Sequence, residues 1–291
     1  MTALEHALAE RGRRVEDVEL LFLTHHHDDH AGLAHVIRER SGCVVAAHEL
    51  VAELLADEPA SRAAEERYAA GLLRTNGAPP ELVATVAETS HAARAMVASV
   101  AVDDRLHDGD TLLAGGREHR VHLRPGHSPT DTLLVDDHGV GLVGDHLLSR
   151  ITPALLAHHR SAAVEEIGRP RLLPQYRASL AATRALDLQL ALPGHGAAID
   201  APSALIDRRL ADHEARASDL LRQLPGKPAS AWEIVVASWR ARRLDSTDHP
   251  VSVSFVLACE MLALLDLLLE QGRVVEHHGE DGVIRYARCP A

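Results

Sequence analysis

Residues 24–30 read THHHDDH and place four histidines and two aspartates in seven positions. The run VELLFL at 18–23, directly before them, is mostly apolar, which is typical of a buried strand. After His30, residues 31–40 have the pattern of a helix, and CVVAA at 43–47 has that of a second buried strand. This succession of strand, loop, helix and strand predicts an α/β fold, in which functional loops follow the carboxyl ends of strands.

The spacing within this stretch indicates two pairs of metal ligands. Residues two positions apart on an extended chain face the same side, so His25 and His27 can converge on one ion. Asp29 and His30 follow where the loop turns into the predicted helix, and they can approach a second ion. Imidazole and carboxylate ligands suit zinc, manganese or iron. The spacers between the ligands, which we expect to contact other groups or solvent, are His26 and Asp28.

Three later residues share one context, namely an apolar run, then a turn, with glycine close by. They are His127 in RPGHSPTD, Asp145 in GLVGDH and His195 in LALPGHG. Glycine has no side chain, so it lets the backbone and a ligand approach closely. We therefore expect these three residues to complete a site that holds two metal ions.

The remaining patterns predict a domain organisation. Residues 48–98 have no strand pattern and read as helices rich in alanine and glutamate, so we expect a helical insert there. Short apolar runs separated by glycine and aspartate turns then indicate a β-meander from residue 100 onward. The PGKP stretch at 225–228 is the best linker candidate, and beyond it two predicted helices precede a predicted hairpin. We predict a catalytic domain over 1–224 and a small second domain over 225–291.

The ordered set from His25 to His195 resembles the metallo-β-lactamase-fold hydrolases, in the branch that contains glyoxalase II. The helical insert and the C-terminal segment resemble the subgroup related to the human lactamase-like endoribonuclease. This resemblance implies an α/β fold of the αββα sandwich type, with a small winged-helix-like domain at the C-terminus.

The resemblance also implies a role for each candidate residue. His25, His27 and His127 would hold the first metal ion, and a second triad would hold the other, namely Asp29, His30 and His195. Asp145 would bridge the two ions, and a hydroxide between them would attack the substrate. Asp29 would also act catalytically, by orienting that nucleophile or accepting its proton. We expect two divalent cations, with Zn²⁺ favoured and Mn²⁺ or Fe²⁺ as alternatives.

The N-terminus departs from this family pattern. Family members begin with two or three strands before the metal loop, whereas only 24 residues precede His25 here. We therefore expect the N-terminal strands of the sandwich to be missing. An uncovered apolar sheet edge favours aggregation, so a homo-oligomer that covers the edge is one expectation.

The amino-acid composition indicates which kinds of partner the protein binds and where in the cell it is found. A formal charge of −12 and an aromatic content of 2% argue against nucleic acid as the partner, because phosphate backbones are bound by clustered Lys and Arg and bases by aromatic stacking. The segment from Lys227 onward has seven Lys and Arg against nine Asp and Glu. Three widely spaced cysteines and the lack of a long apolar run predict a cytoplasmic protein that does not enter a membrane.

These observations favour a dinuclear metallo-hydrolase that acts on a small-molecule ester, thioester or lactone. One alternative is a metal-dependent nuclease of the same fold, which the C-terminal resemblance favours. The other is an inactive, truncated member of the family, which the short N-terminus favours. The sequence does not name the substrate.

Overall fold

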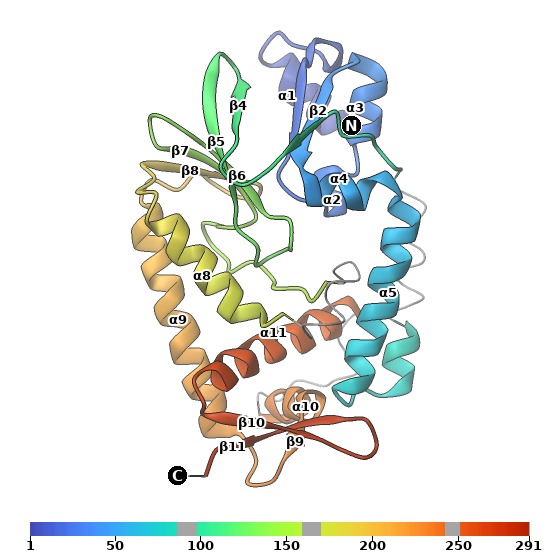
Figure 1. Cartoon of the computed structure of the whole chain (residues 1–291), viewed down its shortest axis with the longest axis vertical. Coiled ribbons are helices and arrows are strands. Elements are labelled where there is room, and N and C mark those ends of the chain that lie inside the picture. Colours follow the sequence, from blue (N-terminus) through green and yellow to red (C-terminus); the bar gives the residue numbers. More distant parts are fainter. Residues whose placement is uncertain (86–97, 159–169, 242–250, 291) are drawn as a thin grey trace.

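A computed structural model of the chain describes residues 1–85, 98–158, 170–241 and 251–290. Two sheets lie near each other at one end of the molecule, and long helices lead from them to a small sheet at the other end (Figure 1). The N-terminal elements are α1 (Thr2–Ala9), the 3-10 helix η1 (Val15–Asp17), β1 (Leu20–Leu23), α2 (Asp28–Ala31), α3 (Ala34–Ser41), β2 (Val44–His48), α4 (Glu49–Ala56), α5 (Glu58–Thr75) and β3 (Asp104–Leu106).

The chain continues with a second, larger sheet and the helices that follow it. The middle elements are β4 (Thr111–Ala114), β5 (Arg117–Leu123), β6 (Thr132–Asp136), β7 (Val140–Gly144), α8 (Leu172–Arg184), β8 (Leu190–Pro193) and α9 (Pro202–Gln223). The C-terminal elements are β9 (Ala229–Ser230), α10 (Ala231–Ala241), α11 (Val251–Glu270), β10 (Val274–His278) and β11 (Ile284–Arg288).

The sheets are mixed. β1, β2 and β3 form a parallel sheet in that order, while β4 to β7 form an antiparallel meander that β8 extends in parallel to β7. The small sheet has the antiparallel order β10-β11-β9. The meander and the α/β organisation predicted from the sequence are thereby confirmed.

Alternating side chains bury the two faces of each main sheet in different cores. In β2, Val45 and Ala47 pack with helices α1, α3 and α4, whereas Ala46 packs toward β4, β5 and β6. In β6, Leu134 belongs to this core between the sheets, and Leu133 belongs to the core with α8 and α9. Because successive strand residues point to opposite faces, this alternation produces the layer order helix, sheet, sheet, helix.

The predicted helical insert is present as α4, α5 and a further helical stretch at 80–85, and residues 86–97 of the expected insert lie outside the described residues. The end of α5 that lies away from the metal loop is hydrogen-bonded to the C-terminal segment, residues 225–291. Asn76 follows α5, and its side-chain Oδ1 accepts a hydrogen bond from Tyr286 at 3.1 Å, while its carbonyl accepts one from the Trp232 amide at 3.1 Å. Both Asn76 and Tyr286 are buried. The C-terminal segment therefore packs on the insert as well as on α8 and α9.

Among the described residues, no helix combines the length and the apolar character needed to cross a membrane. The apolar helix α11 carries Asp266 in its last two turns. The side chain of Asp266 is fully buried, accepts a hydrogen bond from the Leu172 amide at 2.9 Å and pairs with Arg171 at 3.1 Å. It thus fixes the start of α8 rather than interrupting a hydrophobic face.

Candidate metal centre

The THHHDDH stretch leaves the end of β1 as an extended loop and enters α2 at Asp28. His27, directly before α2, has extended backbone angles of φ −64° and ψ 149°. The loop is tied to the second sheet, because the Thr132 amide at the start of β6 donates a hydrogen bond to the Thr24 carbonyl at 2.9 Å. The position where the first sheet meets the meander therefore carries the candidate ligands.

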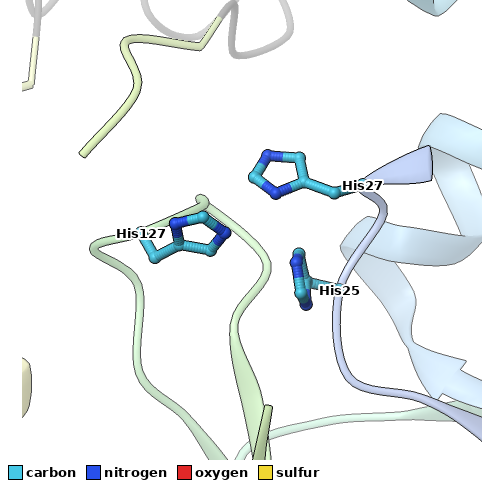
Figure 2. Close-up of side chains that lie close together, drawn as sticks. All are labelled: His25, His27 and His127. Atoms are coloured by element: carbon cyan, nitrogen blue, oxygen red, sulfur yellow. The ribbon is translucent and has the colours of Figure 1, made fainter. Parts of the chain in front are cut away.

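Three histidines form the first cluster. Nitrogen atoms of His25, His27 and His127 all lie within 4.8 Å of one another. Their rings are nearly perpendicular and face a common space between the loop after β1 and the loop after β5 (Figure 2). His127 Nδ1 donates to the Ala154 carbonyl at 2.7 Å, which leaves Nε2 directed at the cluster. His25 is held in a similar way, because its Nδ1 lies 3.0 Å from Thr24 Oγ1.

The second cluster contains Asp29, His30 and His195. Asp29 Oδ2 lies 3.1 Å from His195 Nε2 and 3.6 Å from His30 Nε2. Asp29 and His195 are both more than half exposed, whereas the His30 side chain is mostly buried. The second cluster is therefore the more open of the two.

Asp145 lies between the clusters. Its Oδ1 is 3.5 Å from His30 Nε2, and its Oδ2 is 3.8 Å from His127 Nε2 and 3.6 Å from His195 Nε2. One carboxylate thus reaches a histidine of each triad. The structure brings all seven residues named from the sequence into one place, and His25 also lies close to His30 and Asp145.

The residues present fit metal ions. Four buried polar atoms at the centre have no hydrogen-bond partner among the residues that the structure describes: His25 Nε2, His30 Nε2, His127 Nε2 and Asp145 Oδ1. A buried donor or acceptor left unpaired costs about 1–3 kcal/mol, so four at one point need a common explanation. Nitrogen and carboxylate oxygen donors that converge in this way are the ligand set of zinc and related divalent cations. Coordination of metal ions would satisfy all four atoms.

The charges at the site favour the ligand forms of these residues. Burial, reinforced by the neighbouring histidines, holds the pKa values of His25 and His27 well below the usual histidine range, so both rings are neutral. Burial by itself would raise the pKa of Asp145, but the contacts with His30, His127 and His195 lower it overall. Metal ions bind neutral imidazole and ionised carboxylate, which are the forms favoured here for His25, His27 and Asp145. The pKa of His30 is raised instead, because contacts with Asp145 and Asp29 outweigh the effect of burial, so a metal ion must displace its proton.

Two glycines permit the close approach of these loops. A Cβ atom added at Gly194, beside His195, would lie 2.6 Å from Asp145 Oδ1 and 2.6 Å from His30 Cε1. Gly144, beside Asp145, has φ +49°, and a Cβ there would lie 2.9 Å from the side chain of Thr24. The glycines that the sequence places next to the candidate ligands therefore leave room for them.

The spacer residues of the loop contact groups outside the ligand set. His26 Nδ1 lies 3.0 Å from Thr130 Oγ1, and both oxygens of Asp28 are bound by the guanidinium of Arg62, with one bond of 3.0 Å. Reasoning from the sequence missed Thr130 and Arg62. Arg62 carries no local signal, because it is one of several charged residues on a helix whose position depends on the tertiary fold.

A cavity of about 440 Å³ opens beside the centre. The metal loop forms one wall, α4 and α5 form another, and residues 156–158 with Phe255 of α11 close the remainder. Its lining combines apolar side chains with acidic ones, and Asp29 is the predicted ligand that is both exposed and part of the wall. The cavity therefore gives a bound molecule access to the second cluster.

Comparison with known proteins agrees with this geometry. A curated relative from Bacillus subtilis (strain 168), described as probable metallo-hydrolase YqjP, is 27% identical over 235 residues, which are 80% of this chain and 71% of that protein. The crystal structure of the metallo-beta-lactamase family protein TTHA1429 from Thermus thermophilus aligns with a TM-score of 0.74 at 28% identity, over 99% of this chain and 85% of that chain. A beta-lactamase domain protein from Burkholderia ambifaria also aligns with a TM-score of 0.74, at 29% identity, over 94% of this chain and 75% of that chain.

The sequence profile of the metallo-beta-lactamase superfamily matches residues 1–195, a range that contains all seven candidate ligands. This match and the clusters of histidine and aspartate show that the chain belongs to the metallo-beta-lactamase superfamily and is a metallo-hydrolase.

Proposed function

We propose that the protein binds two divalent cations, with Zn²⁺ favoured, and hydrolyses a small ester, thioester or lactone. The observation that carries this proposal is the place of Asp145, whose carboxylate lies near histidines of both triads. The predicted assignment gives His25, His27 and His127 to the first ion and Asp29, His30 and His195 to the second. When bound, the two ions would lower the pKa of water and polarise the substrate oxygen.

The cavity supports a small organic substrate. Its volume of about 440 Å³ falls within the range of small-molecule sites, which is about 300–1,000 Å³. Leu54, Leu55 and Phe255 offer an apolar surface for an acyl group, and four acidic residues of the lining, Asp28, Asp29, Glu65 and Glu66, face one arginine. Apart from the metal ions, this wall offers a phosphate chain a single arginine, which is already bound to Asp28, so we rank the nuclease alternative below the acyl hydrolase.

The residues of the chain have separate tasks in this proposal. Asp29 is the proposed catalytic residue, because its carboxylate is exposed in the cavity and its Oδ2 contacts His195 at 3.1 Å. A carboxylate in that place can orient the attacking nucleophile and accept its proton. The apolar residues of the opposite wall would hold the acyl group and exclude water from it.

Several finer expectations from the sequence belong to the same proposal. We retain the relationship to glyoxalase II and the lactamase-like endoribonuclease, the division near residue 225 into a catalytic and a winged-helix-like domain, and the cytoplasmic location argued from the isolated cysteines. A homo-oligomer that covers the first sheet also remains a prediction, and β1 lies at one end of the order β1-β2-β3.

The test combines metal content with turnover. Purified protein should contain up to two divalent ions per chain and should hydrolyse at least one member of a panel of thioesters, esters and lactones. Asp145→Asn should lose both activity and metal content, whereas Asp137→Asn, the same change at a residue whose side chain is 81% exposed, should change neither. Activity that survives complete metal removal would contradict the proposal, and metal-dependent cleavage of RNA without acyl hydrolysis would favour the nuclease.

A further inference from the structure

His27 is held from outside the metal centre by another histidine. In Figure 2, the ring nitrogen next to the side-chain attachment, Nδ1, faces His25 and His127, and the other nitrogen points away from them. That outer nitrogen, Nε2, lies 3.3 Å from Nε2 of His158. The two ring centroids are 5.2 Å apart and the planes are inclined by 29°, so the rings meet edge to edge. The contact therefore has the geometry of a hydrogen bond between imidazoles.

The direction of this hydrogen bond follows from the chemistry of His27. A neutral imidazole that gives the lone pair of Nδ1 to an ion carries its proton on Nε2. His27 Nε2 then donates, and His158 Nε2 accepts. His158 in turn carries its own proton on Nδ1, which lies 3.7 Å from Oε2 of Glu65 on α5. Glu65 thus lies within ion-pair distance of His158, which is hydrogen-bonded to His27.

The other two histidines of the first triad have outer partners of a different kind. His25 contacts the hydroxyl of its neighbour Thr24, and His127 donates to the main-chain carbonyl of Ala154. The outer partner of His27 comes instead from a distant segment and is supported from α5. One turn before Glu65, Arg62 on the same helix binds Asp28, the residue that follows His27. Helix α5 therefore contacts Asp28 directly, through Arg62, and reaches His27 only through His158.

We propose that His158, supported by Glu65, is a positioning residue for His27 and that the affinity of the first metal position depends on it. This inference rests on the proposed metal site, although not on any particular substrate. The hydrogen bond fixes the ring orientation and tautomer of a ligand and increases its basicity. Loss of such outer partners weakens metal binding by roughly 10–100-fold.

The experiment measures Co²⁺ affinity by competition with a chelator, together with the visible absorption spectrum of the Co²⁺ protein. His158→Ala should weaken one of the two binding steps by roughly 10–100-fold, leave the other step unchanged and alter the spectrum. His158→Gln keeps an oxygen that can accept from His27 Nε2, so it should restore most of the affinity and the spectrum. Thermal denaturation of each variant without metal establishes that it folds.

Glu65 has a matched control in its neighbour Glu66, which lines the same cavity. Glu65→Gln should weaken the same binding step, by less than His158→Ala does, whereas Glu66→Gln removes the same charge and should change that step much less. Wild-type affinity and an unchanged spectrum in His158→Ala would overturn the inference, as would equal effects of the two glutamate changes. Because both readouts concern metal binding, a failure of the proposed hydrolase activity would leave them interpretable.

Discussion

The substitution Gly194→Ala tests the geometry of the centre at its narrowest point. The added Cβ would lie 2.6 Å from Asp145 Oδ1 and 2.6 Å from His30 Cε1, whereas ordinary contacts begin at 3.4 Å. The backbone cannot easily retreat, because the Gly194 amide donates to the Gly144 carbonyl at 2.9 Å. The two side chains must therefore move by about 0.8 Å, which is the difference between the ordinary and the built distance.

That displacement exceeds what metal coordination tolerates. Ligand distances in metal sites stay within about 0.2 Å of their preferred values, so a shift of about 0.8 Å would remove Asp145 and His30 from coordination. A misplacement of about 1 Å in an active site lowers the rate by roughly 100-fold. We expect Gly194→Ala to lose at least one metal ion per chain and to lower kcat/KM by about 100-fold or more. Metal analysis and steady-state kinetics measure the two effects.

A matched control is Gly226→Ala, because a Cβ at Gly226 meets no atom within 4 Å. That variant should keep the metal content and activity of the wild type. If Gly194→Ala also kept both ions at wild-type affinity, Asp145 and His30 could not be ligands in the arrangement described. The assignment of Asp145 as a bridge between the two triads would then be refuted.

Three further predictions concern catalysis, pH and stability. Asp29→Asn should lower kcat by roughly 100-fold or more while the first metal ion is retained, because a general base contributes about 10²–10⁴-fold; metal analysis beside kinetics separates this outcome from loss of both ions. Burial, with nearby arginines, lowers the pKa of His213 from 6.5 to about 4. As the pH drops from 6.5 toward 4, the unfolded chain therefore binds a proton at His213 while the folded chain does not. The free energy of unfolding falls over that window for this reason. This loss amounts to about 3 kcal/mol, and His213→Leu should flatten the pH dependence of urea unfolding over that window; an unchanged slope would contradict the assignment. Asp266→Ala should lower the free energy of unfolding by about 1–3 kcal/mol in urea titrations, because the buried Leu172 amide loses its partner while the partly exposed Arg171 keeps Glu276; an unchanged free energy of unfolding would contradict this role.

The clustering of the candidate ligands could be predicted from the sequence because several of them have a local signal. His25, His127 and His195 follow apolar runs that form strands, and turns with glycine separate the later two runs from their ligands. The end of a strand fixes where the next side chain points, so local patterning predicts the centre although its parts are up to 170 residues apart in sequence. The strand and helix limits differ from prediction mainly at their ends, as for the helix predicted over 31–40, which is α3 (Ala34–Ser41).

Other parts of the fold carry no such signal. Strand β3 (Asp104–Leu106) has two exposed charged residues out of three, and it is a strand only because it pairs with β2. The residues that contact the metal loop from outside the ligand set also have no recognisable sequence pattern. Arg62 and Glu65 resemble any charged residues on a solvated helix, and His158 follows a segment without periodicity. Their contacts with the metal loop form only when α5 packs beside the loop in the tertiary structure.

The C-terminal segment (residues 225–291) is hydrogen-bonded to the residue that follows α5, at the end of the helix away from the metal loop. At one end, α5 contacts the metal loop through Arg62; at the other, Asn76 is hydrogen-bonded to Tyr286 and Trp232 of the C-terminal segment. The same segment supplies Phe255 to the cavity. The C-terminal segment thus contacts the rest of the chain both at the cavity and at the end of α5. We infer that the C-terminal segment holds the insert in place and thereby shapes the cavity beside the metal centre.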